Sequence, residues 1–273
     1  MKFVVVTVLA MGCHAPSSPV ARSTAQPAVA SVACVSPREF GAIPNDGLDD
    51  RASLQLALNS CLLVQLEAGR YDVTTLPYPR PYAVLTMPTG SSITGVGNAT
   101  VVAFRGDPHG QDWHGIQLGT RTELRDLSLV VDGMAPTTEE QTHLVQGRGP
   151  LSDIRIENVT FKHPVVAGSS MGDCIQFVGY PPAADGTGDK RIRRVMVRNN
   201  IFGSCARSGI AIHSGLHDSQ ITGNLFLDIA DQDIDEEGTG DIDHIEIDHN
   251  VFERGPSPQS ALSVSIYAAS NHY

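Results

Sequence analysis

Three segments in the C-terminal half of the chain repeat one another, and this repeat constrains the fold more than any other feature. Each segment has an asparagine followed two residues later by a phenylalanine, and the asparagines are spaced by 24 and then 26 residues. The aligned pairs are Asn200 with Phe202, Asn224 with Phe226, and Asn250 with Phe252. Residues 156–161 fit the same frame, with Val159 in the asparagine column. A period of this length indicates a solenoid, in which each repeat contacts only its neighbours.

Four more short strands are predicted, either before the repeated segments or between them. These strands are residues 114–118, 173–177, 209–213 and 233–237. They are too short to bury an apolar face alone, so successive coils must stack in parallel, with equivalent side chains about 4.8 Å apart. Stacked asparagines in turns can then hydrogen-bond to one another as a ladder, while the phenylalanines fill the interior. The sequence therefore predicts an all-β fold, a single-stranded parallel β-helix.

The segment before these repeats carries a family resemblance. Residues 35–50 contain a Glu-Phe-Gly-Ala stretch and a later pair of aspartates, and a helix is predicted at about 51–62 with Asp49 or Asp50 as its N-cap. Residues 64–73 then read as a strand, a glycine turn and a second strand. This block resembles the opening of the pectate-lyase-like superfamily, which includes polygalacturonases, rhamnogalacturonases, phage tailspikes and mannuronan epimerases. The resemblance covers about residues 35–267 and implies a right-handed β-helix whose N-terminal end is capped by the helix.

The first 33 residues are predicted to be a signal peptide followed by a flexible linker, and residues 34–273 to be the β-helix domain. Lys2 precedes an apolar run, residues 3–11, which ends at Gly12 and Cys13. This pattern resembles a bacterial lipoprotein signal, which implies a lipid on Cys13 and membrane anchoring; the alternative is cleavage after an Ala-Val-Ala site at 28–30. Either way we expect an exported protein, on the cell surface or secreted into the periplasm or medium. Residues 261–267 read as one more strand without an obvious cap, so the chain is either C-terminally incomplete or self-associates through that end.

Cysteine usage and charge narrow the function classes. In an exported protein we expect disulfides between Cys34 and Cys61 and between Cys174 and Cys205, with free buried thiols as the alternative. The formal net charge of −11 argues against nucleic acid as a partner. It also argues against a polyuronate substrate, unless bound calcium or a cluster of arginines offsets the repulsion between negative charges.

The candidate catalytic residues follow from the direction of alternate side chains. If Ile116, Ile175, Ile210 and Ile234 point inward, then Gln176 and Asp235 share an outward column. Glu237 then projects from the same strand as Asp235, with His213 in the neighbouring coil. Carboxylates two residues apart on a strand are about 6.5–7 Å apart, close to the spacing of an inverting glycosidase. We therefore predict Asp235 and Glu237 as acid and base, with His213 orienting one of them.

Two other interpretations of this acidic strand stay open. A lyase would need a cation to neutralise a uronate, and calcium held by Asp233, Asp235 and Glu237 could supply it; no other cofactor is expected. The acidic run 228–237 is also typical of plain solvated surface.

A second motif adds Asp173. Residues 171–177 and 208–215 resemble the paired "G-D-D-C-I-A-I" and "G-H-G-I-S-I-G-S" motifs of polygalacturonases, and Asp173 matches the second aspartate of the first motif. Gly172 and Ser208 replace the first aspartate and the histidine of that pattern, so the polygalacturonase mechanism itself is not implied.

Gln176, Trp113 and Arg194 are the predicted substrate-binding residues. The predicted function is that of a carbohydrate-active enzyme, a hydrolase or a lyase, with polysaccharide as its partner. The alternative is a non-catalytic surface β-helix that binds glycan or serves as an adhesin or structural module.

Overall fold

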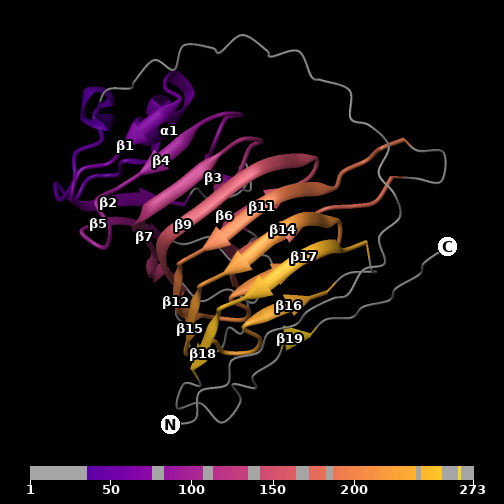
Figure 1. The fold of residues 1–273 in the computed structure, drawn as a ribbon. Helices are drawn as coiled ribbons and strands as arrows, with labels where there is room; N and C mark the ends of the chain where they lie inside the picture. The colour runs from indigo at the N-terminus through magenta and orange to yellow at the C-terminus, as the bar shows by residue number, and fades with distance from the viewer. Residues whose placement is uncertain are drawn as a thin grey trace.

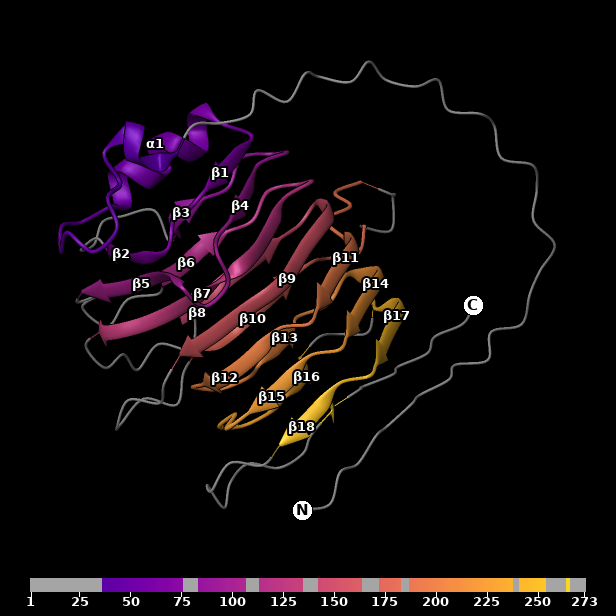
Figure 2. The same cartoon turned by 60° about the vertical axis from the view of Figure 1, so that its left-hand side comes forward.

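The computed structural model describes residues 36–75, 83–106, 113–134, 142–163, 172–182, 187–237, 241–253 and 264–265. It contains a short 3-10 helix at Pro37–Phe40, the helix α1 at Arg51–Ser60, and parallel strands throughout the rest of the described chain. The strands form three rows, which are labelled in Figures 1 and 2.

Row one and row two belong to one sheet, because two long strands run through both rows. These strands are β7 (Glu123–Met134) and β9 (Leu151–His163). The other strands of row one are β1 (Leu63–Gln65), β4 (Ser92–Thr94), β11 (Ile192–Arg198), β14 (Leu216–Thr222) and β17 (Asp243–Asp248). The other strands of row two are β2 (Gly69–Thr74), β5 (Thr100–Gly106), β12 (Ile201–Cys205), β15 (Leu225–Leu227) and β18 (Val251–Glu253).

Row three is a separate sheet of seven strands. It consists of β3 (Ala83–Thr86), β6 (Trp113–Gln117), β8 (Thr142–Arg148), β10 (Asp173–Val178), β13 (Ile210–Ile212), β16 (Ile234–Glu236) and β19 (Val264–Ser265). Each coil of the solenoid contributes one strand to this sheet and pairs in parallel with the coils on either side. The predicted parallel β-helix is confirmed. Strand β8 was not predicted; the coil that carries it has Leu127 and Leu129 at the register positions of the asparagine and phenylalanine columns.

The asparagine ladder is present and buried between rows one and two. The side-chain Oδ1 of Asn224 accepts bonds from the backbone N–H and the Nδ2 of Asn200, both at 3.0 Å. Asn250 serves Asn224 in the same way, at 2.9 and 3.0 Å. At the other end of the ladder Asn200 accepts from the backbone N–H of Val159 at 2.9 Å, so Val159 does occupy the asparagine column. Each turn thus satisfies the backbone of the coil beside it.

The phenylalanine column fills the interior as predicted. The rings of Phe161, Phe202, Phe226 and Phe252 stack in succession, with centroids 4.9, 4.6 and 5.1 Å apart. Towards the N-terminal coils the same column continues with smaller residues, Leu129 and Val102, at equivalent register positions. Burial of this apolar column is the main favourable contribution to stacking the coils.

Helix α1 covers the N-terminal end of the solenoid, as Figure 1 shows, and contacts β1, β2 and β3 of the first coil. Its buried residues are Leu54, Ala57 and Leu58, and it ends at Ser60, two residues before the predicted end. The carboxylate of Asp50 does not cap the helix. It accepts instead from the backbone N–H groups of Ile43 and Asp72, and burial raises its pKa to about 6. Among the described helices, none is long and apolar enough to cross a membrane.

Several sequence-based predictions fall outside the described residues and stay predictions. They are the signal peptide and linker at residues 1–33, the lipidation of Cys13 and the pairing of Cys34 with Cys61. The proposed self-association through the C-terminal end also remains untested, although β19 does pair with β16 as one more strand.

Candidate active site on the third row of strands

The candidate site lies on the outward face of row three. Strand register places Ile116, Val145, Ile175, Ile210 and Ile234 in one column, and all five side chains are buried in the core. The predicted inward column is therefore confirmed. Because side chains alternate along a strand, Asp235 and Glu237 project from the face opposite to Ile234. In the neighbouring coil, Ala211 pairs with Asp235, and Glu237 lies beside His213 at its edge.

Asp235 and Glu237 are in direct contact through a hydrogen bond between their carboxyl groups. Burial, the charge of Glu237 and that hydrogen bond raise the pKa of Asp235 to about 7, although the nearby Arg207 opposes the rise. The spacing of these two carboxyl groups as acid and base stays a prediction.

Arg207 connects this carboxyl pair to the coil on the other side. Its guanidinium forms two hydrogen bonds with Asp173, Nε to Oδ1 at 2.8 Å and Nη2 to Oδ2 at 2.6 Å. Its remaining terminal nitrogen, Nη1, donates to Glu237. Asp173 is fully buried and Arg207 is only 15% exposed, so both charges depend on each other for compensation. Burial alone would raise the pKa of Asp173, but His143 and Arg207 together hold it below its usual value.

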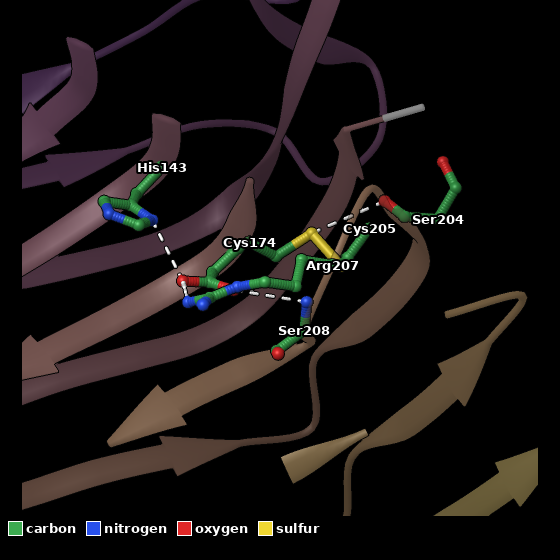
Figure 3. Close-up of a disulfide and its surroundings, with 7 residues drawn as sticks. His143, Cys174, Ser204, Cys205, Arg207 and Ser208 are labelled. Atoms are coloured by element: carbon green, nitrogen blue, oxygen red, sulfur yellow. Dashed lines mark hydrogen bonds and ion pairs between the residues drawn. A yellow bond between two sulfur atoms is a disulfide. The ribbon is translucent and has the colours of Figure 1, made fainter. Parts of the chain in front are cut away.

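A disulfide fixes the segments that carry Asp173 and Arg207 (Figure 3). It joins Cys174, the residue after Asp173, to Cys205, two residues before Arg207, with a Cα–Cα distance of 5.6 Å. This is the pairing that the sequence predicted. The backbone N–H of Ser208 also donates to Asp173 Oδ1 at 3.2 Å. Asp173 and Arg207 are thus held by covalent and hydrogen-bonded anchors on both sides.

The polar face continues along row three through histidines and glutamines. His143 Nδ1 lies 3.0 Å from Asp173 Oδ2, and the His143 ring stacks on His114 with a centroid distance of 5.2 Å. In the adjacent column, Gln146 Nε2 donates to Gln176 Oε1 at 2.7 Å. Buried polar groups that pair with one another in this way form a connected network across the coils. Gln176 is on the predicted face, in the same column as Asp235.

His213 lies at the exposed edge of this face. Its Nδ1 is 3.8 Å from Glu237 Oε2, and its side chain is 43% exposed. The four residues predicted as catalytic, Asp173, His213, Asp235 and Glu237, are therefore brought together by the fold.

Trp113 and Arg194, two predicted substrate-binding residues, are placed elsewhere. Trp113 is 1% exposed and packs against His163 and Phe104, which favours a packing role over contact with a sugar. Arg194 lies on β11 of row one and forms a bidentate ion pair with Asp153, at 2.6 and 3.0 Å.

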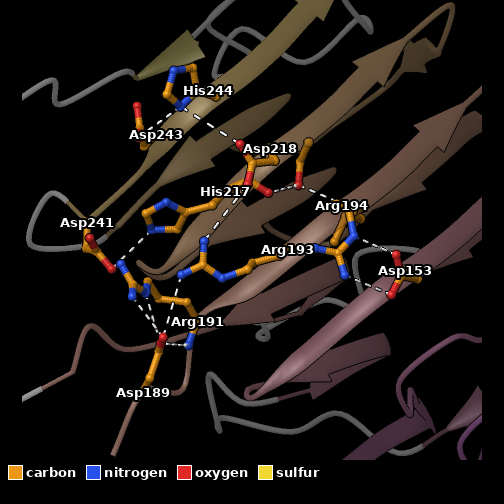
Figure 4. A network of polar contacts seen from close by, with 12 residues as sticks. Asp153, Asp189, Arg191, Arg193, Arg194, His217, Asp218, Asp241, Asp243 and His244 are labelled. Carbon is orange, nitrogen blue, oxygen red and sulfur yellow. Dashed lines mark hydrogen bonds and ion pairs between the residues drawn. The ribbon is translucent and has the colours of Figure 1, made fainter. Parts of the chain in front are cut away.

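Figure 4 shows Arg194 within a surface network of arginine, aspartate and histidine residues on row one. Besides the pair with Asp153, the contacts join Arg191 to Asp189, Arg193 to Asp218 and His217 to Asp241. Arg194, which the sequence predicted to bind substrate, is therefore paired with a carboxylate, as are Arg191 and Arg193 beside it.

The calcium interpretation receives no support from geometry. Within the ranges that the structure describes, no group of three His, Cys, Asp or Glu residues is placed to hold a metal ion. The predicted set of Asp233, Asp235 and Glu237 is therefore not such a group.

Two residues of the site were missed at the sequence level. Arg207 stands outside the arginine-rich segment 191–198, in the turn before β13. The register of β10 and β13 places Ser208 opposite Asp173, so aligning these strands would have brought Arg207 to that carboxylate. His143 was missed because strand β8 itself was not identified, and no repeat marker in the sequence indicates it.

Comparison with solved structures places the fold in a known class. The A-module of the mannuronan C-5 epimerase AlgE4 of Azotobacter vinelandii superposes with a TM-score of 0.58 and 18% identity, over 77% of this chain and 58% of that chain. The A-module of AlgE6 from the same organism gives 0.57 and 16%, over 83% and 61%. A proposed glycosyl hydrolase of Parabacteroides merdae gives 0.50 and 14%, over 84% and 97%.

These likenesses show the fold. The chain spans about three fifths of the length of the two epimerase modules. No family model matches the chain, and no curated protein matches it in sequence. The protein has the right-handed parallel β-helix fold that these solved structures share.

Proposed function

We propose that this chain is a polysaccharide-active enzyme, a glycoside hydrolase, in which Asp235 and Glu237 form an acid–base pair on row three. The observation that carries the proposal is the contact between the two carboxyl groups beside Arg207. Burial and the charge of the neighbouring Glu237 raise the pKa of Asp235 to about 7, so Asp235 can hold a proton near neutral pH. A carboxylic acid with a pKa near 7 can protonate a glycosidic oxygen at neutral pH, and the neighbouring carboxylate can then accept a proton from water.

The charges around the pair favour hydrolysis over elimination. A lyase acting on a uronate needs a cation to neutralise the substrate carboxylate. Arg207 has its hydrogen-bonding edges occupied by Asp173 and Glu237, and the surrounding side chains are acidic. A face of this kind repels a polyuronate, as does the net charge of −11. The proposed substrate is therefore a neutral or weakly charged polysaccharide.

The same proposal places the protein outside the cytoplasm. The apolar run after Lys2 supports export, and the disulfide between Cys174 and Cys205 suits an oxidising compartment. Lipidation of Cys13 belongs to this proposal, and mass spectrometry of the mature N-terminus tests it.

The test is turnover of a polysaccharide panel that includes xylan, laminarin, alginate and polygalacturonate, with and without calcium. Reducing ends report hydrolysis, absorbance of unsaturated uronides reports elimination, and nuclear magnetic resonance reports epimerisation. Asp235→Asn and Glu237→Gln should each lower the rate at least about 100-fold. Glu246→Gln is the matched control, because Glu246 accepts a hydrogen bond from Gln220 on row one, away from the site. Turnover that survives in both site variants would rule out the acid–base pair.

A second candidate function is glycan binding without turnover. It is favoured by the complete pairing of Asp173 with Arg207 and His143, because a buried, saturated ion-pair network also serves a purely structural role. Retention of the protein on a polysaccharide that it leaves uncut would support this candidate.

A further inference from the structure

Tyr180 has a property that no other aromatic residue of the described chain shares. It is 41% exposed, whereas the other aromatic side chains in the described ranges are buried or half-buried. An aromatic ring is costly to leave in water, and exposed tyrosines are typical of binding surfaces, where the ring gives contact area and the hydroxyl stays wet. The ring of Tyr180 is therefore accessible to a ligand.

The ring stands beside the candidate acid–base pair. Its centroid is 6.3 Å from that of His213, in an edge-to-face arrangement. His213 Nδ1 in turn lies 3.8 Å from Glu237 Oε2. A single imidazole thus separates the exposed ring from the carboxyl pair, on the same edge of row three.

The backbone around Tyr180 is fixed, although it leaves the regular strand β10. Tyr180 and Lys190 exchange two backbone hydrogen bonds, at 3.2 and 3.1 Å, which close the base of the loop. Gly179 donates to Ser214 O at 3.0 Å, and it approaches Gly215 so closely that a Cβ on Gly179 would lie 2.7 Å from Gly215 O. The ring is therefore presented from a firmly held position, so little conformational entropy is lost when a ligand binds to it.

We infer that Tyr180, together with His213, forms a sugar-binding subsite that seats a pyranose ring of a polysaccharide next to the Asp235–Glu237 pair. The apolar C–H face of the sugar packs on the tyrosine ring, and the imidazole of His213 hydrogen-bonds to a sugar hydroxyl. This inference rests on the proposed function for the position of the bound chain relative to the reacting bond. It extends that function by naming a binding residue that the sequence did not indicate.

Affinity electrophoresis in native gels tests the subsite without requiring turnover. The probes are soluble arabinoxylan, laminarin, alginate and polygalacturonate, and dissociation constants follow from retardation against polysaccharide concentration. For a polysaccharide that retards the parent protein, Tyr180→Ala should weaken binding about tenfold, whereas Tyr180→Phe and Tyr180→Trp should stay within about threefold of the parent. Leu56→Ala is the control, since Leu56 is an exposed apolar side chain on α1.

Each outcome decides the inference. Equal binding by Tyr180→Ala and the parent overturns it, as does equal weakening by Tyr180→Ala and Leu56→Ala, or no retardation of the parent by any of the four polysaccharides. Tyrosine-dependent retardation without turnover of the retarded polysaccharide supports the subsite and rejects the hydrolase. Tyrosine-dependent retardation with turnover supports both, and Tyr180→Ala should then raise KM more than it lowers kcat.

Discussion

Arg207 and Asp173 face each other across neighbouring coils and form two parallel hydrogen bonds, at 2.8 and 2.6 Å. Asp173 is completely buried. A buried carboxylate that loses its cation keeps the full desolvation penalty without the compensating attraction. The pair therefore couples the candidate site to the stability of the solenoid.

Replacing Arg207 by methionine should lower the free energy of unfolding by about 3 kcal/mol, since it leaves the charge of Asp173 less compensated. The double variant Arg207→Met with Asp173→Asn should recover part of the loss, because the buried charge is then absent. Urea denaturation followed by circular dichroism measures both. Arg194→Met is the matched control: its ion pair with Asp153 is exposed on both sides, so less than about 1 kcal/mol should be lost. Similar losses in the two arginine variants would contradict the expectation.

The raised pKa of Asp235 predicts a pH dependence of both stability and activity. Its folded-state pKa of about 7 exceeds the roughly 3.9 of an unfolded aspartate. Between these values the folded protein holds a proton that the unfolded chain releases, so this group makes stability fall as pH rises from about 4 to about 7. Asp235→Asn should therefore be more stable than the parent at pH 8 and similar to it at pH 4.

Activity should follow the same titration. If protonated Asp235 is the general acid, the hydrolysis rate falls as pH rises through about 7. Arg207→Lys, which keeps the positive charge but loses the bidentate geometry, should move this limb of the pH–rate profile. A profile with the same alkaline limb in the parent and in Arg207→Lys would argue against control of the proton by Arg207.

The sequence predicted those parts of the fold that depend on repeated side chains. An asparagine and a phenylalanine, as at Asn224 and Phe226, recur every 24 to 26 residues because each side chain stacks on its counterpart in the next coil. This stacking requires parallel coils in register. Strand β8 was missed. Its coil packs against its neighbours through residues other than the repeated asparagine and phenylalanine, namely Leu127 and Leu129. The helix α1 was predicted from its apolar stripe. The role of Asp50 was not, since its partners Ile43 and Asp72 are brought to it only by the fold.

The candidate site was likewise predictable from the sequence only in part. Asp235 and Glu237 were found from the alternation of one strand, which needs only local geometry. Their mutual hydrogen bond depends on side-chain orientation. The bonds of Arg207 to Asp173 and Glu237 depend on distances between coils. Tyr180 was not indicated, because exposure of a ring is a property of the folded surface and leaves no trace in the spacing of residues.

The disulfide between Cys174 and Cys205 predicts sensitivity to reduction. It links residues 31 apart in the chain, and loop-closure entropy for that separation corresponds to about 3–4 kcal/mol of stability. The double variant Cys174→Ala with Cys205→Ala should lose about that amount in urea denaturation. A reductant should destabilise the parent more than it destabilises the double variant. Equal effects of the reductant on both proteins would place its action at another disulfide.

We expect the largest single effect within the ladder at Asn224, because its side chain forms four hydrogen bonds, one more than that of Asn200 or Asn250. Its Nδ2 donates to Val197 O at 2.9 Å and to Asn250 Oδ1 at 3.0 Å, while its Oδ1 accepts from Asn200. Asn224→Ala leaves a buried N–H of Asn200 and the carbonyl of Val197 without these partners, at about 1–3 kcal/mol for each group. We expect a loss of about 3 kcal/mol in the free energy of unfolding, measured by urea denaturation.

The control for this prediction is Asn59→Ala, which removes an exposed asparagine that accepts a bond from Gln55 on the same helix. That change should cost less than about 0.5 kcal/mol, because water replaces the lost partner. A small loss in Asn224→Ala, comparable with the loss in Asn59→Ala, would mean that water enters the ladder and satisfies the freed backbone groups. The coils would then be held together chiefly by the phenylalanine column, and Phe226→Leu should in that case destabilise the protein more than the loss of Asn224.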